Sequence, residues 1–198
     1  MTAKAGGLNL SGATGSVMER GIAGLRQLVD ASLVDIKEVN QQGRHDELFS
    51  LAEFIAEASA AAALSAQAKA VQFHVLAVEP TLAIRGKREL LLSAVINLLQ
   101  NAFKFTHPSS EVVLTAYASA DRILIDVKDH CGGLPADVEQ AMFLPFAQGG
   151  KDRTGLGLGL TISRHAVEAN SGVLSVRDIP GSGCVFTINL PRYSVPTP

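Results

Sequence analysis

Tryptophan is absent from this sequence of 198 residues, and cysteine occurs only twice, as Cys131 and Cys184. Two cysteines are too few for a disulfide framework, and a structural zinc site requires four clustered ligands. We therefore expect neither of these stabilising cross-links here. A chain so poor in cysteine is typical of a reducing compartment, and we expect a cytoplasmic location.

The sequence also lacks a charge excess of either sign and a long apolar run. Its 17 Lys and Arg residues nearly balance 19 Asp and Glu residues, which excludes the strongly basic character typical of nucleic-acid binding. No apolar run approaches the roughly 20 residues that cross a bilayer, and the N-terminus has no apolar signal segment. We therefore expect neither a nucleic-acid partner nor a membrane segment.

The chain does contain enough apolar side chain for a sizeable core. Hydrophobic residues make up 47% and charged residues 18% of the sequence, which is the composition of a globular protein. This composition excludes collagen, low-complexity disorder and a coiled-coil rod. A chain of this length can bury most of the apolar surface that it exposes when unfolded.

The first 50 residues differ in character from the rest. Residues 1–16 are mostly Gly, Ala, Ser and Thr and are predicted to be a flexible tail or a turn between helices. Residues 17–40 are predicted to form a long amphipathic helix, and residues 41–50 a linker. The apolar stripe of that helix is narrow and nearly heptad-spaced, so it requires a partner helix from outside this sequence. The stripe comprises Met18, Ile22, Leu25, Val29, Leu33 and Ile36.

Helical and strand patterns fill residues 51–192, and a tail follows over 193–198. Hairpin-joined strands with helices set apart predict an α+β fold, a two-layer α/β sandwich in which a mostly antiparallel mixed sheet carries helices on one face. The first of these helices is entered at Ser50, with Glu53 in the capping-box position. The predicted helices span 51–70, 87–105 and 161–170, and the predicted strands span 71–78, 112–117, 123–127, 172–178 and 184–190.

Asn97, Asn101 and Lys104 carry the first chemical pattern. They stand at i, i+4 and i+7 of the predicted helix over 87–105, so they share one face, while apolar neighbours such as Leu98 face the core. An amide oxygen can ligate Mg²⁺ and a lysine can neutralise phosphate charge, so this face suits a polyphosphate with its metal. A solvated helix face without a ligand is the alternative.

Asp129 directly follows the predicted strand over 123–127, in the segment Asp129-His-Cys-Gly-Gly133. A carboxylate accepts hydrogen bonds and donates none. It can therefore bind the exocyclic amine of adenine, and it disfavours the carbonyl that guanine carries at the same place. An Asp-Gly turn without a ligand is the alternative.

Two further segments are polar or rich in glycine. Phe143 and Phe146 precede a polar stretch with no apolar period. This arrangement is typical of aromatic residues that anchor the base of a lid. Simple core packing of the two rings is the alternative. Gly155, Gly157 and Gly159 alternate just before a helix, where exposed backbone N–H groups and the positive end of the helix dipole suit phosphate. Their spacing matches neither the dinucleotide fingerprint nor the P-loop.

The order and spacing of these segments resemble the ATP-binding domain of sensor histidine kinases, within the larger group that includes type II topoisomerases and MutL-type mismatch-repair ATPases. The resemblance runs from about Glu47 to Arg192 and is most specific from Asn97 to Leu160. It implies ATP and Mg²⁺ as ligands and makes residues 51–192 an ATP-binding catalytic domain. One departure is Cys131, which replaces the first glycine of the common Asp-x-Gly-x-Gly segment.

The resemblance also implies roles for single residues. Asn101 would ligate Mg²⁺, Lys104 would contact phosphate and Asp129 would read adenine. The other implied nucleotide contacts are Gly133 and Thr187 near the base, Phe143 and Phe146 at the lid anchor, and Thr154, Gly155, Leu156, Gly157 and Gly159 in the phosphate loop.

Asn97 bears on the type of reaction. The hydrolytic members of the group carry a glutamate four residues before the metal-binding asparagine, where it acts as the general base for water. An amide cannot accept that proton. Asn97 therefore favours transfer of the γ-phosphoryl group to another side chain over steady hydrolysis, and we count Asn97 and Lys104 as candidate catalytic residues.

A histidine kinase also needs a nucleophilic histidine on the first helix of a dimeric four-helix bundle. His45 superficially resembles the acceptor, but only 55 residues separate it from Asn101, too few for a turn, a second long helix and the start of the nucleotide domain. Residues 17–40 fit the second bundle helix better. We therefore expect part of the dimerisation bundle here and the acceptor helix outside this sequence.

The resemblance implies two partners for the intact protein: a second copy, bound through the N-terminal helix, and the receiver domain of a response regulator. Two alternatives remain open. One is a degenerate relative that binds nucleotide weakly or not at all and docks its N-terminal helix on a partner. The other is a hydrolytic ATPase of the same fold.

Overall fold

The computed structural model describes residues 46–107, 109–134, 138–145 and 157–194. The predicted helix over 17–40 lies outside these ranges. The chain divides into two units, residues 1–43 and 44–198, and the described fold belongs to the second. Within the described ranges, no helix has the length and apolar character needed to span a membrane.

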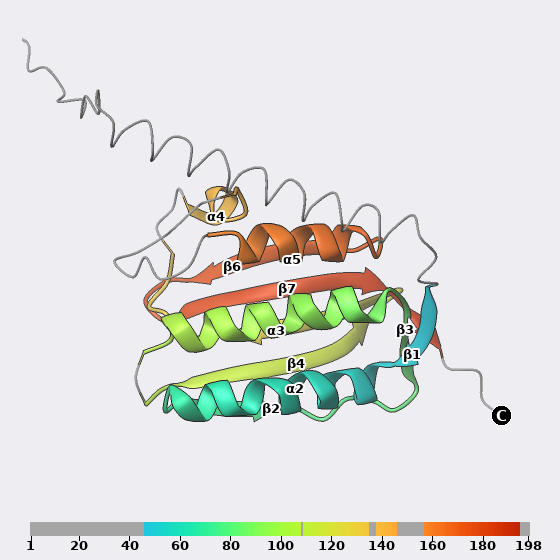
Figure 1. The fold of residues 1–198 in the computed structure, drawn as a ribbon, viewed down its shortest axis with the longest axis horizontal. Helices are drawn as coiled ribbons and strands as arrows, with labels where there is room; N and C mark the ends of the chain where they lie inside the picture. Colours follow the sequence, from blue (N-terminus) through green and yellow to red (C-terminus); the bar gives the residue numbers. More distant parts are fainter. Residues whose placement is uncertain (1–45, 108, 135–137, 146–156, 195–198) are drawn as a thin grey trace, which may run out of the picture. The chain divides into compact units, whose positions relative to one another are not determined.

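A five-stranded sheet forms one layer of the fold (Figure 1). Its order is β2-β4-β5-β7-β6, in which β2 runs parallel to β4 and the other neighbours are antiparallel. The predicted mixed, mostly antiparallel sheet is thereby confirmed. The strands are β2 (Gln72–Val75), β4 (Glu111–Ser119), β5 (Arg122–Lys128), β6 (Val173–Ile179) and β7 (Gly183–Pro191).

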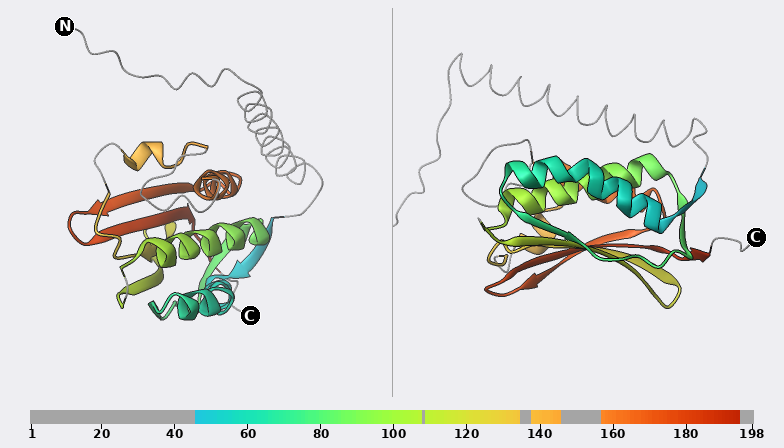
Figure 2. Two further views of the ribbon diagram at one scale, coloured as in Figure 1. Left: turned by 60° about the vertical axis from the view of Figure 1, so that its left-hand side comes forward. Right: turned by 90° about the horizontal axis from the view of Figure 1, so that it is seen from below.

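Helices form the second layer, on one face of that sheet (Figure 2). Side chains alternate along the strands, so Ala116, Ile125 and Ile188 lie in register on neighbouring strands and are buried. The predicted α+β two-layer sandwich is confirmed. The helices of the layer are α2 (Leu51–Ala68), α3 (Arg88–Phe105) and α5 (Gly159–Glu168), and the short helix α4 (Val138–Ala141) precedes α5.

The two long helices begin for different reasons. At the start of α2, the Ser50 hydroxyl accepts a hydrogen bond from the backbone N–H of Glu53 at 3.3 Å, as the capping pattern predicts. At the start of α3, the cap comes from Asn170, which lies beyond the end of α5. The Oδ1 of Asn170 accepts a hydrogen bond from the Lys87 N–H at 2.6 Å. The Asn170 Nδ2 also donates to the Ala166 carbonyl at 2.7 Å, so one buried amide joins the two helices.

Both predicted hairpins are present, and left-handed backbone marks their turns. Ala120, with φ of 53°, joins β4 to β5. Gly181, with φ of 72°, joins β6 to β7, and a glycine adopts this conformation without a steric cost.

Three short strands form a second sheet of order β1-β3-β8 and correct the sequence analysis. The strand β1 (Glu47–Ser50) lies in the segment expected to be a linker, β8 (Tyr193–Ser194) lies in the expected tail, and β3 (Leu82–Gly86) was not assigned. Strands of two to five residues show too little alternation to be recognised. They exist because segments far apart in the sequence pair here.

Candidate nucleotide-binding site

Asp129 lies just beyond the end of β5, and only 3% of its surface is exposed. Its Oδ1 accepts hydrogen bonds from the backbone N–H groups of Cys131 at 3.1 Å and Cys184 at 3.0 Å. Two segments that are far apart in the sequence thus fix the carboxylate. A carboxylate has about four acceptor positions, so it can still accept a bond from an exocyclic amine.

Thr106 connects the loop that follows Asp129 to the end of α3. Its hydroxyl accepts a hydrogen bond from the backbone N–H of His130 at 2.9 Å, and the His107 N–H donates to the His130 carbonyl at 3.0 Å. Thr106 is 8% exposed and caps α3. The loop that follows Asp129 is therefore held against the C-terminal end of α3.

Gly133 has a structural reason to be glycine in this loop. Its φ is 102°, a conformation that other residues rarely adopt, and a Cβ there would lie 3.0 Å from Oδ1 of Asp178. The same Oδ1 accepts a hydrogen bond from the Leu134 N–H at 2.7 Å. Asp178, on β6, thus holds the loop from the other side.

The polar stripe of α3 has the predicted orientation. Asn97, Asn101 and Lys104 are half-exposed, whereas Leu98 and Leu99 are fully buried against the sheet. The Nζ of Lys104 also lies 5.0 Å from the centroid of the Phe105 ring.

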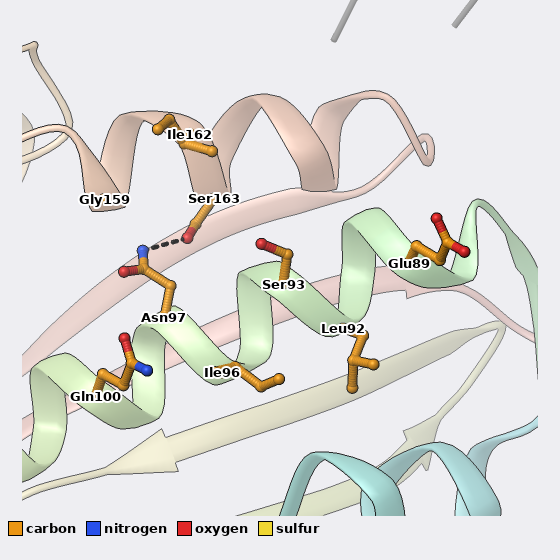
Figure 3. A pocket seen from close by; sticks show the side chains of 9 residues that line it. All are labelled: Glu89, Leu92, Ser93, Ile96, Asn97, Gln100, Gly159, Ile162 and Ser163. Carbon is orange, nitrogen blue, oxygen red and sulfur yellow. Dashed lines mark hydrogen bonds between the residues drawn. The ribbon is translucent and has the colours of Figure 1, made fainter. Parts of the chain in front are cut away.

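Asn97 is fixed against the first turns of α5 (Figure 3). Its Nδ2 donates to the Ser163 hydroxyl at 2.8 Å. Its Oδ1 lies so close to Gly159 that a Cβ on that residue would be 2.7 Å away. Gly159 therefore allows a close approach between α3 and α5, at the helix terminus where phosphate binding is predicted.

A groove of about 510 Å³ runs between α3 and α5 next to this contact (Figure 3). Leu92, Ile96 and Ile162 contribute apolar wall to the groove, and Asn97 also lines it. Asp129 and the C-terminal part of the α3 stripe do not line it. The groove thus shares Asn97 and Gly159 with the candidate site, and it does not reach the rest of that site.

The predicted lid is only partly described. Phe143 is 8% exposed within the core, and its carbonyl accepts a hydrogen bond from the Thr161 hydroxyl of α5 at 3.0 Å. Gly157 has a φ of 68°, which suits glycine. The remaining predicted residues of the lid and phosphate loop, Phe146, Thr154, Gly155 and Leu156, lie outside the described residues.

The structure does not bring Thr187 to the base site, which corrects that expectation. The Thr187 hydroxyl donates to Oδ1 of Asp126 at 2.7 Å, on the face of the sheet opposite the helices. Successive residues of a strand point to opposite faces, and Phe186 and Ile188 are the buried ones. The residue of β7 whose backbone N–H donates to the Asp129 carboxylate is Cys184, three positions earlier.

Sequence reasoning missed three residues that shape the site: Cys184, Thr106 and Ser163. Each forms a hydrogen bond with a residue at least 24 positions away in the sequence. Thr106 stands two residues after Lys104, so the motif itself offered a signal. The contacts of Cys184 and Ser163 depend on how the elements pack and left no local signal.

Comparison with known proteins identifies the family. Residues 86–194, more than half of the chain, match the family described as histidine kinase-, DNA gyrase B-, and HSP90-like ATPases. This chain belongs to that family. The resemblance drawn from the sequence is thereby confirmed, and the site above lies in a histidine kinase-like ATPase domain.

Individual relatives are sensor proteins. The chain is 32% identical over 176 residues to the circadian input-output histidine kinase CikA of Thermosynechococcus vestitus, a match that covers 84% of this chain and 24% of that protein. It is 34% identical over 120 residues to the sensor protein KdpD of Escherichia coli, covering 60% of this chain and 13% of that protein. The chain thus spans a quarter or less of the length of these relatives.

Solved structures of this family have the same fold. Full-length ShkA, crystallised in complex with AMPPNP, is 26% identical with a TM-score of 0.66, and the match covers 76% of this chain and 32% of that one. The mycobacterial sensor histidine kinase MprB is 24% identical with a TM-score of 0.65, and the match covers 76% of this chain and 99% of that one. At 24% identity, the likeness to MprB concerns the fold alone.

Proposed function

We propose that this chain is the ATP-binding catalytic region of a sensor histidine kinase. It binds Mg·ATP and transfers the γ-phosphoryl group to a histidine on an acceptor helix supplied from outside this sequence. The observation that carries the proposal is the setting of Asp129: a buried carboxylate whose Oδ1 two backbone N–H groups hold in place. Such a group accepts an amine and selects adenine over guanine.

The phosphate end of the nucleotide is assigned to α3 and α5. Asn101 supplies an amide oxygen, a hard ligand that suits Mg²⁺, and phosphate and water complete the coordination of such a site. Lys104 neutralises phosphate charge. The N-terminus of α5, with Gly157 and Gly159 before and at its first residue, offers backbone N–H groups to the anion.

Asn97 supports transfer over hydrolysis. Its Nδ2 donates to Ser163 and its Oδ1 packs against Gly159, so the side chain is held beside the proposed phosphate position. An amide in that position orients its surroundings but takes no proton from water. The phosphoryl group is therefore kept for a nucleophile brought by another helix.

The partners follow from this role. A second copy binds through the helix predicted over 17–40, and the receiver domain of a response regulator takes the phosphoryl group from the acceptor histidine. We place the reaction in the cytoplasm, where ATP and a reducing environment coexist.

Calorimetry with the purified chain tests nucleotide choice. Mg·ATP is expected to bind more tightly than Mg·GTP, because Asp129 has nothing to donate to the guanine carbonyl. Equal affinities for the two nucleotides would contradict the role of Asp129.

A second experiment tests phosphoryl transfer. The acceptor helix is restored upstream of this sequence, and acid-labile phosphate on histidine is measured after incubation with Mg·ATP. ATP consumption without phosphohistidine would favour the hydrolytic ATPase instead.

A further inference from the structure

Cys131 and Cys184, the only cysteines of the chain, lie side by side next to Asp129. Both thiols are free, and their Sγ atoms are 2.8 Å apart. The sulfur atoms of a disulfide are about 2.05 Å apart, so only a small approach separates this pair from a covalent bond.

Backbone contacts hold the pair together. The two cysteines are 53 positions apart in the sequence, and the N–H groups of both donate to the same Oδ1 of Asp129. The buried carboxylate of Asp129 thus holds the backbone of both cysteines in place. The proximity of the sulfurs is a property of the folded chain and not of the local sequence.

The two thiols are not equivalent. Cys131 is half-buried, whereas Cys184 is 1% exposed, so an oxidant in solution reaches Cys131 first. The hydrogen bond between the thiols lowers the pKa of Cys131 and raises the pKa of Cys184. This division matches a reactive thiol with a resolving thiol beside it.

Metal binding is the other chemistry that this cluster suggests. Ligand atoms of Asp129, Cys131 and Cys184 lie within 4.8 Å of one another. However, this group within the described residues has three members, and a closed zinc site takes four ligands. The observations therefore favour sulfur oxidation over metal binding.

We propose that Cys131 and Cys184 are a peroxide-sensitive thiol pair that closes to an intramolecular disulfide beside Asp129. The Cys131 thiol loses its proton, and the thiolate attacks hydrogen peroxide: the S–O bond forms as the O–O bond breaks, and the departing hydroxide takes up a proton to give water. The Cys184 sulfur then attacks the sulfenic sulfur, the S–S bond forms as the S–O bond breaks, and water leaves with the Cys184 proton. In sum, two thiols and one peroxide give one disulfide and two waters.

Nucleotide is expected to protect the pair, and this part alone rests on the proposed function. An adenine amine bound to the Asp129 carboxylate lies next to Cys131, since the carboxylate and both sulfurs share one small cluster. Mg·ATP at ten times its dissociation constant should then slow the oxidation about tenfold, if only the free protein reacts.

The test uses the reduced full chain treated with hydrogen peroxide, quenched with an alkylating reagent and weighed intact by mass spectrometry. We expect a loss of two hydrogen atoms, no alkylation, and recovery of two alkylatable thiols after dithiothreitol. Urea-unfolded protein is the matched control and should form the disulfide more slowly, because unfolding separates the sulfurs.

Two variants assign the roles of the sulfurs. Cys184→Ala should accumulate sulfenic acid at Cys131 that dimedone traps. Cys131→Ser should leave Cys184 unoxidised in the folded protein. Disulfide-linked dimers in place of the internal bond, or a folded protein that reacts no faster than the unfolded one, would overturn the proposal.

The nucleotide experiment separates the two proposals. If calorimetry detects no ATP binding but the disulfide forms as described, the proposed function fails and the thiol pair stands. If Mg·ATP binds and leaves the oxidation rate unchanged, the base does not lie at Cys131 and the protection is overturned.

Discussion

At the scale of single residues, two aspartates of one strand region show how position decides role. Asp126, within β5, accepts hydrogen bonds from the hydroxyls of Thr187 at 2.7 Å and Tyr117 at 3.1 Å. Asp129, just after the strand, is bound by backbone N–H groups and is nearly fully buried. The two side chains are chemically identical, and the fold assigns only Asp129 to the candidate base site.

Asp129→Asn is expected to weaken Mg·ATP binding by about 1.5 to 3 kcal/mol, the range for a hydrogen bond to a charged group. The amide retains one acceptor oxygen for the backbone and turns its NH₂ toward the adenine amine, where two donors oppose each other. Calorimetry measures the affinity. Asp126→Asn makes the same chemical change on the other face of the sheet and should leave the affinity unaltered. Equal losses in both variants would count against the assignment.

Asn97→Glu is expected to raise slow ATP hydrolysis, because it places a base where the hydrolytic relatives carry one. General-base assistance typically contributes about 10² to 10⁴ in rate when the geometry is right. Phosphate release measures turnover, and calorimetry checks that Mg·ATP still binds despite the added charge.

Gln100→Glu is the matched control for that charge, since Gln100 lies one turn further along α3 and lines the same groove. It should not raise hydrolysis. If Asn97→Glu binds Mg·ATP normally and hydrolyses it no faster, Asn97 is not in line with the γ-phosphate, and the preference for transfer over hydrolysis loses its physical basis.

At the scale of elements, two amides join α3 to α5, one in the first turns of α5 and one beyond its end. Asn97 of α3 contacts Ser163 and Gly159 near the start of α5. Asn170, beyond the end of α5, caps the start of α3 through Lys87. The relative position of the two helices, and therefore of the proposed metal and phosphate groups, depends on these contacts.

Gly159→Ala is expected to lower the free energy of unfolding, although alanine favours helices over glycine by about 1 kcal/mol. The reason is that the new Cβ would lie 2.7 Å from Oδ1 of Asn97 and must displace it. In the Asn97→Ala background the obstacle is gone, so the same change should become neutral or stabilising. Urea denaturation of the four proteins measures the coupling, and an equal effect in both backgrounds would refute the contact.

Asn170→Ala is expected to lower the free energy of unfolding by about 1 to 3 kcal/mol, since it leaves the buried Ala166 carbonyl and the Lys87 N–H without their partner. Urea denaturation measures the loss. Gln67→Ala removes an exposed amide from α2 and should change stability little. A similar small change in both variants would show that the cap does not stabilise the helix pair.

At the scale of the whole molecule, the proposed function separates the catalytic unit from its phosphate acceptor. The chain alone is expected not to phosphorylate itself, because we expect the acceptor histidine to lie outside this sequence. Incubation with labelled ATP, followed by detection of acid-labile phosphate, measures this. Stoichiometric label at His45 would reverse the rejection of that residue and, with it, the assignment of residues 17–40 to the bundle.

The sequence alone was sufficient for the local features of this protein. The stripe of Asn97, Asn101 and Lys104 on one helix, the two hairpins and the position of Asp129 after a strand all follow from periods of 3.6 and 2 and from turn residues. These patterns extend over about 20 residues or fewer, so one segment suffices to recognise them. The family resemblance rests on the order and spacing of these segments along the chain, and both are properties of the sequence.

Only the tertiary structure decided which distant residues meet. The contact between Cys131 and Cys184 spans 53 positions, that between Asn97 and Ser163 spans 66, and that between Asn170 and Lys87 spans 83. The face on which Thr187 lies likewise depends on strand register, in which a shift by one residue exchanges the two faces. Such contacts arise from the packing of helices on the sheet and from strand pairing, and no local period encodes them.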